Sequence, residues 1–199
     1  MWIEDVWRDY KYILHIDTRD LLFFANPFAA LYRNKITGLL SVSEATPFKG
    51  NWWNTNWVTK YAGAHVTGMI SGLAMHGREI RIICSGLYGG TALALLDYFQ
   101  AFARGIEVAS SEAKGIVGID QGVHIYLHLI GLQLEKFPHK VMLLDEAVGP
   151  MRHWYDHKSS VMRDRLGRHV NCHKKPYSIL HQLDRYGMFW NDAVSDYHG

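Results

Sequence analysis

The chain has 199 residues, 48% of them hydrophobic and 20% charged, which is the composition of a globular domain and excludes a mainly disordered chain. Its formal net charge of +2 is too small to indicate a nucleic-acid-binding protein. Its basic residues are scattered except in 157–175, and we interpret this segment as a solvated loop or arm, with an anion-binding surface as the alternative. Two cysteines imply no disulfide framework and favour a reducing, cytoplasmic compartment, and no apolar run approaches the length of a membrane span.

Four nearly continuous apolar runs predict β-strands, in the order 11–16, 79–84, 140–145 and 177–182. Such runs are typical of a sheet that is covered on both faces, because neither face then needs polar side chains. Cys84 lies in the second run, where we interpret it as a small buried hydrophobic residue.

Two helices are predicted between these strands. The first begins near Thr91 and the second at Asp120, both of which are favourable N-cap residues. Their apolar stripes at helical spacing are Ala92, Leu95, Leu96, Phe99, Phe102 and Ala103 in the first helix, and Val123, Tyr126, Leu127 and Ile130 in the second. A further short helix is expected over 51–61. The alternation of strands and helices predicts one α/β domain over 1–199, with a largely parallel or mixed sheet.

An acidic motif follows the first predicted strand, with Asp17, Arg19 and Asp20 inside "HIDTRDLLFF". If the strand ends at about Asp17 and the chain turns, both carboxylates lie at the carboxyl end of a strand, where open α/β sheets bind ligands. Two carboxylates there suit Mg²⁺ or Mn²⁺ bound through the phosphates of a ligand. Arg19 then either helps to hold a diphosphate or neutralises Asp20. The alternative is a capping aspartate beside an Asp–Arg surface pair.

Three later stretches also place polar or small residues at the ends of predicted elements. In "IICSGLYGGTALALL" the strand is expected to end in Ser85 and Gly86, whose small size would let a ligand approach the backbone. In "GIDQGVHIYL" helix capping explains Asp120 but leaves Gln121 unexplained. In "YSILHQLDRY" His181 ends an apolar run, as either a ligand-binding or a structural histidine.

Taken together, the stretches "HIDTRDLLFFANPF", "ICSGLYGGT", "GIDQGVHIYL" and "ILHQLDRY" resemble, in the same order, the motifs of a group of nucleotide-diphospho-sugar transferases. The resemblance covers residues 11 to about 186 and extends distantly to the glycogenin-type and lipopolysaccharide galactosyltransferase families. It implies a GT-A-like α/β fold and a glycosyltransferase that moves a sugar from a nucleotide-diphosphate sugar to a hydroxyl acceptor, a glycan or other.

The resemblance also implies a metal site, formed by Asp17, Asp20 and His181. A nitrogen donor beside carboxylates favours Mn²⁺ over Mg²⁺. The wider superfamily spaces its two acids two residues apart, so Arg19 stands where the second acid would be.

Donor-binding and catalytic roles follow from the same resemblance. Ser85 and Gly86 match the turn that borders the donor sugar, with Arg19 near the diphosphate. Asp120 and Gln121 match an acid–glutamine pair near the reacting carbon, where a carboxylate or amide oxygen would stabilise an oxocarbenium-like carbon.

Three tryptophans, Trp52, Trp53 and Trp57, cluster in the predicted helix at 51–61. They either stack on acceptor sugars or pack against the protein, since Trp53 and Trp57 are four residues apart and share a helix face.

In GT-A enzymes, strand–helix units ahead of the acidic motif bind the nucleotide base and ribose. Only 16 residues precede Asp17, too few for one complete βαβ unit, so we expect these first units to be lacking. The chain is then a fragment or a shortened protein, and a missing front would allow a membrane-associated or Golgi-lumenal location.

Two other functions remain open. A non-catalytic sugar- or nucleotide-binding module would bind its ligand without turnover. A phosphohydrolase would use Asp17 as a nucleophile, although the Asp-x-Asp-x-Thr pattern of such enzymes has an acid where Arg19 stands.

Overall fold

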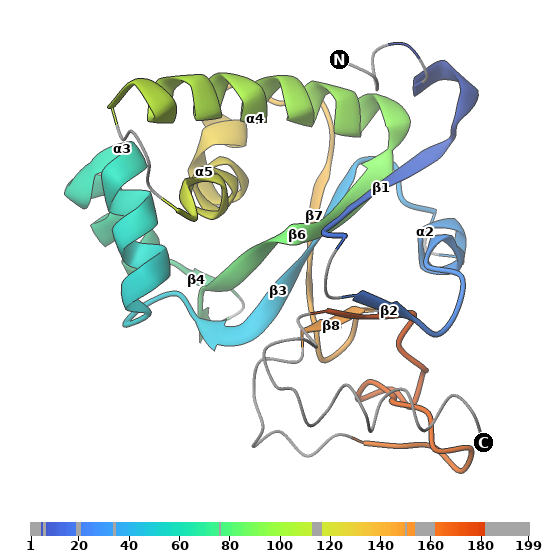
Figure 1. The fold of residues 1–199 in the computed structure, drawn as a ribbon. Coiled ribbons are helices and arrows are strands. Elements are labelled where there is room, and N and C mark those ends of the chain that lie inside the picture. The colour runs from blue at the N-terminus through green and yellow to red at the C-terminus, as the bar shows by residue number, and fades with distance from the viewer. Residues whose placement is uncertain are drawn as a thin grey trace.

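Four strands form the main sheet, in the order β1-β6-β3-β7 (Figure 1). The computed structural model describes residue 5 and residues 7–18, 21–33, 35–75, 77–112, 117–149, 151–153 and 162–181. The strands of the main sheet are β1 (Tyr12–Ile16), β6 (Arg81–Thr91), β3 (Leu39–Pro47) and β7 (Val141–Asp145). β1 and β3 both run antiparallel to β6, whereas β7 runs parallel to β3, so the sheet is mixed.

A second sheet has three short strands in the order β2-β9-β8. These are β2 (Leu21–Phe23), β9 (Ile179–His181) and β8 (Met151–His153), and a small hairpin joins β4 (Ala74–Met75) to β5 (Arg78–Glu79). Leu21 of β2 pairs with His181 of β9. This pairing brings the segment after β1 next to a strand that lies near the other end of the described chain.

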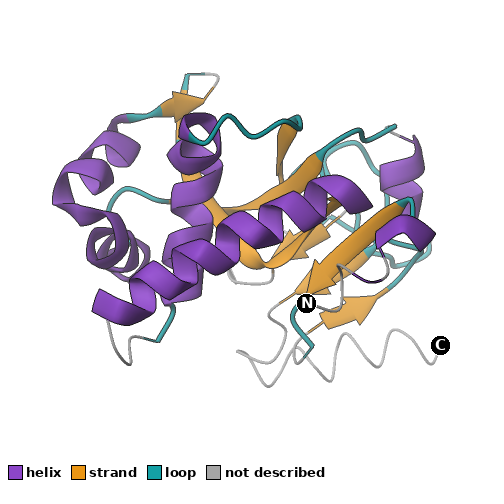
Figure 2. Cartoon of the chain, turned by 90° about the horizontal axis from the view of Figure 1, so that it is seen from above, coloured by secondary structure: helices purple, strands orange, loops and turns teal. Residues whose placement is uncertain are grey.

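Helices cover one face of the main sheet (Figures 1 and 2). This layer contains α3 (Trp52–Gly72), α4 (Ala92–Glu112) and α5 (Ile119–Tyr126), and α5 continues through a π-helical segment (Leu127–Gly131) into α6 (Leu132–Leu134). The short helix α2 (Phe28–Arg33) lies apart from this layer, and a 3₁₀ turn is formed by Trp7–Asp9. α5 contacts α3, α4 and β6, so it lies in the centre of this helical layer.

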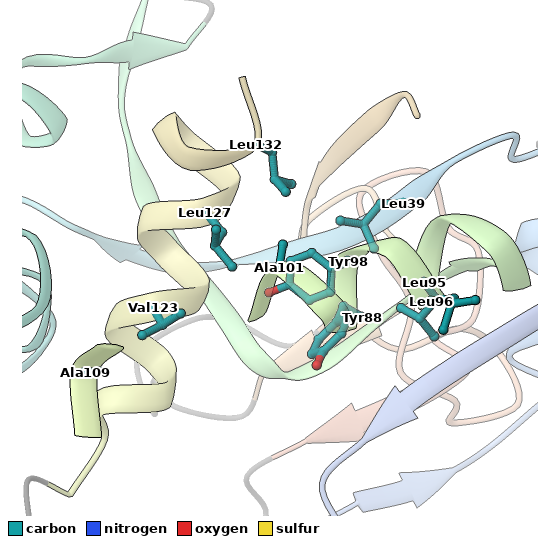
Figure 3. Packing of buried hydrophobic residues seen from close by; sticks show 10 residues of the cluster. All are labelled: Leu39, Tyr88, Leu95, Leu96, Tyr98, Ala101, Ala109, Val123, Leu127 and Leu132. Atoms are coloured by element: carbon teal, nitrogen blue, oxygen red, sulfur yellow. The ribbon is translucent and has the colours of Figure 1, made fainter. Parts of the chain in front are cut away.

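The largest group of buried apolar side chains fills the space between α4, α5 and the sheet (Figure 3). Tyr88 of β6 and Tyr98 of α4 are both buried and meet edge to face, with ring centroids 5.3 Å apart. Val123 and Leu127, two residues of the predicted stripe on the second helix, are buried in the same group. The helix faces predicted from spacing therefore point into the core, except that Ala103, the last residue of the first stripe, is exposed.

Most predicted elements are present. The strands at 11–16 and 140–145 correspond to β1 and β7, and the strand at 177–182 is confirmed as the shorter β9, with residue 182 outside the described part of the chain. Thr91 caps α4 through its Oγ1, which accepts a hydrogen bond from the Ala94 N–H at 3.4 Å. The short helix expected at 51–61 is present as the first part of α3, which is kinked at Gly63 (φ 87°, ψ 162°) before it continues to Gly72.

Two predictions about local structure are wrong, and one strand was missed. The strand predicted at 79–84 does not end in a turn at Ser85 and Gly86, because β6 continues to Thr91. The glycines of β6 let neighbouring strands approach closely, because a Cβ at Gly90 would overlap the carbonyl of Gly38. Asp120 is not the N-cap of α5, since Gly118 holds that position in the left-handed region with φ 83°. β3 was not predicted at all.

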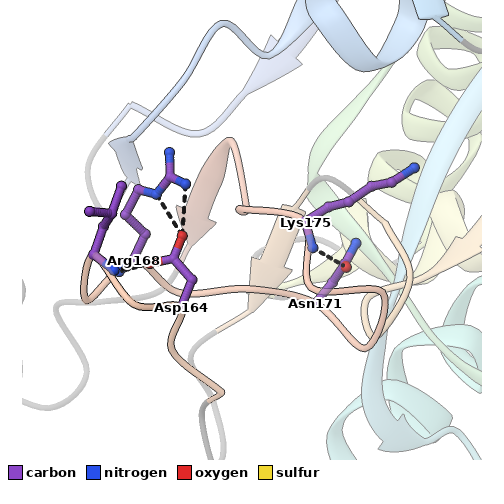
Figure 4. Close-up of polar contacts among 5 residues, drawn as sticks. Asp164, Arg168, Asn171 and Lys175 are labelled. Carbon is purple, nitrogen blue, oxygen red and sulfur yellow. Dashed lines mark hydrogen bonds and ion pairs between the residues drawn. The ribbon is translucent and has the colours of Figure 1, made fainter.

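Residues 162–175 form a loop of tight turns that leads into β9 (Figure 4). Asp164 accepts hydrogen bonds from the Arg168 guanidinium at 2.7–2.8 Å, and Asn171 Oδ1 accepts one from the Lys175 N–H at 3.1 Å. The described part of 157–175 is a loop as expected, but it is not solvated throughout, because His169, Val170 and Asn171 are buried. Residues 157–161 lie outside the described residues.

Candidate functional site

A cavity of about 330 Å³ lies where β1 ends, beside the middle of β6 and the first turns of α3 and α5. Six of the eight site residues predicted from the sequence line it: Asp17, Ser85, Gly86, Asp120, Gln121 and His181. The other two, Arg19 and Asp20, lie outside the described residues.

Asp17, Gly86 and His181 meet at one point of this cavity. β1 ends at Ile16, and the Asp17 N–H donates a hydrogen bond to the Gly86 carbonyl at 2.8 Å. Asp17 Oδ2 lies 3.4 Å from His181 Nε2, and the two side chains meet over Gly86, where a Cβ would overlap Asp17 Oδ2 and come within 2.8 Å of His181 Cε1. Glycine at this position therefore makes room for the aspartate–histidine contact.

Cys84 lies behind His181. Its Sγ is 3.5 Å from His181 Nδ1 and accepts a hydrogen bond from the Gly86 N–H at 3.3 Å. Nδ1 therefore faces the sulfur and Nε2 faces Asp17, and a tautomer with the ring proton on Nδ1 would direct the Nε2 lone pair towards Asp17, as metal binding requires. Cys84 is buried, as expected from its apolar strand, but its sulfur also orients an imidazole, which the sequence did not indicate.

Asp17 and His181 fit two neighbouring positions of a divalent ion. Two adjacent ligands of an octahedral ion bound at about 2.1 Å lie about 3 Å apart, close to the 3.4 Å measured here. Within the described ranges, no group of three or more histidine, cysteine, aspartate and glutamate side chains could hold a metal ion. The third predicted ligand, Asp20, lies outside those ranges.

Gln121 joins α5 to β6 through both groups of its side-chain amide. Its Oε1 accepts a hydrogen bond from the Ser85 N–H at 2.9 Å, and its Nε2 donates one to the Ile83 carbonyl at 2.5 Å. β1 pairs with β6 only between Leu87 and Thr91, so the Gln121 amide takes the place that a neighbouring strand would occupy at 83–85. This contact explains why a glutamine stands here, and its catalytic role stays a prediction.

Asp120 is exposed and follows Ile119 in the first turn of α5, where a carboxylate is favoured by the helix dipole. Its charge reaches the buried phenol of Tyr88. Burial first, and then the negative charges of Asp120 and Asp17, raise the pKa of Tyr88 well above its ordinary value of 10.0.

The lining residues fall into two groups according to the elements that carry them. The strand wall comprises Asp17, Cys84, Ser85, Gly86 and His181. The helix wall comprises Asn51, Trp53, Asn54, Trp57, Gly118 and Asp120. A Cβ at Gly118 would overlap the Trp57 indole, so the helix wall depends on a glycine at the start of α5.

Three carboxylates belong to the described lining of the cavity. Asp17, Asp120 and the buried Glu44 of β3 all line it, and its described lining residues include no lysine or arginine. Glu44 was missed by the sequence analysis, because Ser41, Ser43 and Glu44 interrupt the apolar run of β3. An anionic ligand would need a cation to bind among these carboxylates.

A chain of buried polar groups behind the helix wall ties α5 to α4 and β3. The Tyr98 hydroxyl lies 2.6 Å from His124 Nδ1, and Ser41 Oγ lies 2.7 Å from His128 Nε2. His128 Nδ1 donates a hydrogen bond to the His124 carbonyl at 2.9 Å. Burial lowers the pKa of His124 well below 6.5 and that of His128 to about 4, so both imidazoles are neutral at physiological pH.

No protein-family model matches the sequence, and no curated protein matches it either. A helix long and apolar enough to cross a membrane is not found among the described residues. The function is therefore inferred from the residues of the cavity and from the resemblance of the four motifs.

Proposed function

We propose that the chain is a glycosyltransferase of the GT-A type, which moves a sugar from a nucleotide-diphosphate sugar to a hydroxyl acceptor. The observation that carries this proposal is the convergence of the four motifs on one cavity. Asp17 and His181, from motifs near opposite ends of the described chain, lie 3.4 Å apart over Gly86, and Asp120 and Gln121 line the same cavity.

The charge of the cavity supports a metal-dependent reaction. A diphosphate would be repelled by Asp17, Glu44 and Asp120 unless a cation lay between them. Asp17 Oδ2 and His181 Nε2 would hold Mn²⁺ or Mg²⁺, with Asp20 as the third protein ligand. Such an ion, when bound, stabilises the negative charge of the leaving nucleoside diphosphate as a Lewis acid.

The other residues have roles that follow from their positions. The Asp120 carboxylate is exposed in the cavity, where it would stabilise positive charge on the anomeric carbon or accept the proton of the attacking hydroxyl. Gln121 holds the backbone of Ser85 in place, so that the donor sugar would lie against a fixed strand. Burial of Cys84 and its contact with Nδ1 would keep His181 in the tautomer that binds a metal.

Thermal unfolding with and without Mn²⁺, in the presence of UDP-, GDP- and other nucleotide-sugars, tests the proposal. A ligand that binds only the native state should raise Tm by roughly 5 to 10 °C at about 100 times its Kd. We expect a shift that needs the metal and that disappears in Asp17→Ala and His181→Ala. Release of nucleoside diphosphate by the same samples would distinguish a transferase from a module that binds without turnover.

Two exposed residues outside the cavity provide matched controls. Glu107→Ala on α4 removes a carboxylate and His65→Ala on α3 removes an imidazole, and both variants should keep the full shift. The proposal is wrong if no nucleotide-sugar shifts the wild-type Tm with metal, or if Asp17→Ala and His181→Ala retain the shift.

A further inference from the structure

A second hollow, of about 530 Å³, lies at the end of the main sheet where β1 begins. Tyr12, the first residue of β1, lines it and pairs with Thr91 at the end of β6, which lines it as well. The candidate site lies at the other end of β1, and a strand of five residues is roughly 16 Å long. The two sites share no described lining residue, so the second hollow is a separate feature of the molecule.

Two lysines give this hollow a positive charge. Lys11 and Lys35 both line it, and both side chains are exposed, so their ammonium groups are open to a ligand. Neither lysine forms an ion pair with a described residue, and the described lining contains no carboxylate. Because the two ammonium groups repel each other, an anion that contacts both would be favoured by both charges.

The ammonium group of Lys11 is restrained by two tyrosines. Its Nζ lies 5.5 Å from the ring centroid of Tyr12 and 5.8 Å from that of Tyr32, and these two rings meet edge to face at 4.8 Å. An aromatic face attracts an ammonium group but is no substitute for a charged hydrogen-bond acceptor. The position of Lys11 is therefore favoured by the protein, while its N–H donors can still bind an anion.

Hydroxyl groups add further donors to the lining. Thr91 Oγ1 accepts a hydrogen bond from the Ala94 N–H at 3.4 Å, so its own proton can be donated elsewhere. Thr37 and Tyr32 are exposed, and neither hydroxyl has a hydrogen-bond partner among the described residues. A phosphate group, with three or four acceptor oxygens, matches a lining that presents two ammonium groups and several hydroxyls.

We propose that this hollow binds a phosphate group through the ammonium groups of Lys11 and Lys35, with the hydroxyl of Thr37 as a further donor. The phosphate belongs to a free phosphorylated compound or to a lipid headgroup, since both present the same oxygens. No metal ion is needed, because the protein itself supplies the positive charge. This site goes beyond the proposed transferase activity and does not depend on it.

Calorimetric titration of inorganic phosphate in metal-free buffer tests the site, because without a metal ion the carboxylates of the candidate site repel phosphate. We expect binding by the wild type and at least roughly tenfold weaker binding by the double variant Lys11→Gln/Lys35→Gln. Thr37→Ala, which leaves both charges in place, should weaken binding about threefold.

Lys49→Gln/Lys60→Gln is the matched control for the double variant. It removes the same charge from two exposed lysines that do not line the hollow, so it should bind phosphate as the wild type does. Asp17→Ala, which should lose metal-dependent donor binding, should also keep phosphate binding in full. The outcome for the second hollow is thereby separated from the outcome for the proposed function.

Sedimentation with lipid vesicles distinguishes the two sources of the phosphate group. Phosphatidic acid in phosphatidylcholine vesicles presents a phosphate monoester, whereas phosphatidylserine vesicles of the same surface charge do not. Stronger binding to the phosphatidic acid vesicles that depends on Lys11 and Lys35 would assign the site to a lipid headgroup. Binding of free phosphate without this preference would assign it to a free compound.

Three results would overturn the site. The first is a wild type that binds no free phosphate and binds phosphatidic acid vesicles no better than phosphatidylserine vesicles. The second is equal binding by Lys11→Gln/Lys35→Gln and Lys49→Gln/Lys60→Gln, which would show either no role for these lysines or a general effect of charge. The third is loss of phosphate binding in Asp17→Ala, which would place the phosphate in the candidate site.

Discussion

The strand wall and the helix wall of the cavity are built in different ways. The strand wall is positioned by the backbone: the Asp17 N–H bonds the Gly86 carbonyl, and His181 is held by its pairing with Leu21. The helix wall is positioned by side chains, through the Asn51 cap and the packing of Trp57 on Gly118. The groups that would hold a metal thus lie at the ends of strands, whereas the tryptophans of the cavity lie on a helix.

The two walls meet in Gln121, which is carried by α5 and bonded to the backbone of β6. If the walls have separate tasks, substitutions in the strand wall should alter metal-dependent binding, and changes behind the helix wall should alter the stability of α5.

The largest effect is expected for Gly86→Ala. The added methyl would overlap the Asp17 carboxylate, which is half-exposed and can rotate away, and would crowd the buried ring of His181. Loss of the pair should weaken metal-dependent nucleotide-sugar binding by roughly 100- to 1,000-fold, because each displaced group contributes about one order of magnitude or more. Calorimetric titration of the donor in the presence of Mn²⁺ measures this change.

Gly68→Ala is the matched control for this substitution. Gly68 is exposed on α3 with no atom within 4 Å of an added Cβ, so alanine there should raise stability by about 0.5–1 kcal/mol and leave donor binding unchanged. Donor binding by Gly86→Ala at wild-type strength would show that the contact of Asp17 with His181 has no role in binding.

The strand wall could largely be anticipated from the sequence, because its residues follow apolar runs and belong to the motifs that carry the family resemblance. The turn expected at Ser85 and Gly86 is wrong because glycine indicates both turns and close strand packing. At Gly86 the close neighbours are side chains from distant strands, Asp17 and His181, which local sequence does not reveal.

The helix wall and β3 were harder to predict. Ser41 of β3 is buried because its hydroxyl pairs with His128, far along the chain, so the polar residues that hid this strand are satisfied only in the folded protein. Glu44 was missed for the same reason. Trp53 was noticed, but its place in the lining of the cavity depends on how α3 packs against α5.

The second prediction concerns acid pH, which should lower the stability of the protein by protonating His128, a buried residue behind the helix wall. The folded protein holds the pKa of His128 at about 4, against 6.5 in the unfolded chain, so the unfolded state binds the proton first as the pH falls. Stability should be complete above pH 6.5 and fall between pH 6.5 and 4, by roughly 3 kcal/mol from this group. Urea unfolding measured across this range follows the change.

His128→Gln isolates this contribution from those of the other histidines. The variant should be less stable at neutral pH, since the bond to Ser41 is disturbed, but its stability should fall less steeply between pH 6.5 and 4. An unchanged slope in His128→Gln would show that the burial of this imidazole does not link the protein's stability to pH.

The smallest effect on stability is expected for substitutions of Gln121, the residue that joins the two walls. Gln121→Ala would leave the Ser85 N–H and the Ile83 carbonyl without their partner, at a cost of about 1–2 kcal/mol in urea unfolding.

Gln121→Glu is more informative, because an ionised carboxylate accepts from the Ser85 N–H but repels the Ile83 carbonyl, whereas a protonated one can donate to it. The pKa of the new carboxyl should therefore be raised, and its stabilising, protonated form should be lost as the pH rises. The difference in stability between Gln121→Glu and wild type should shrink from pH 7 to pH 4.5. Gln133→Glu, at an exposed position of α6, should show no such recovery. If Gln121→Glu matches the wild type in stability at every pH but abolishes turnover, the glutamine acts on the substrate and not as the link between α5 and β6.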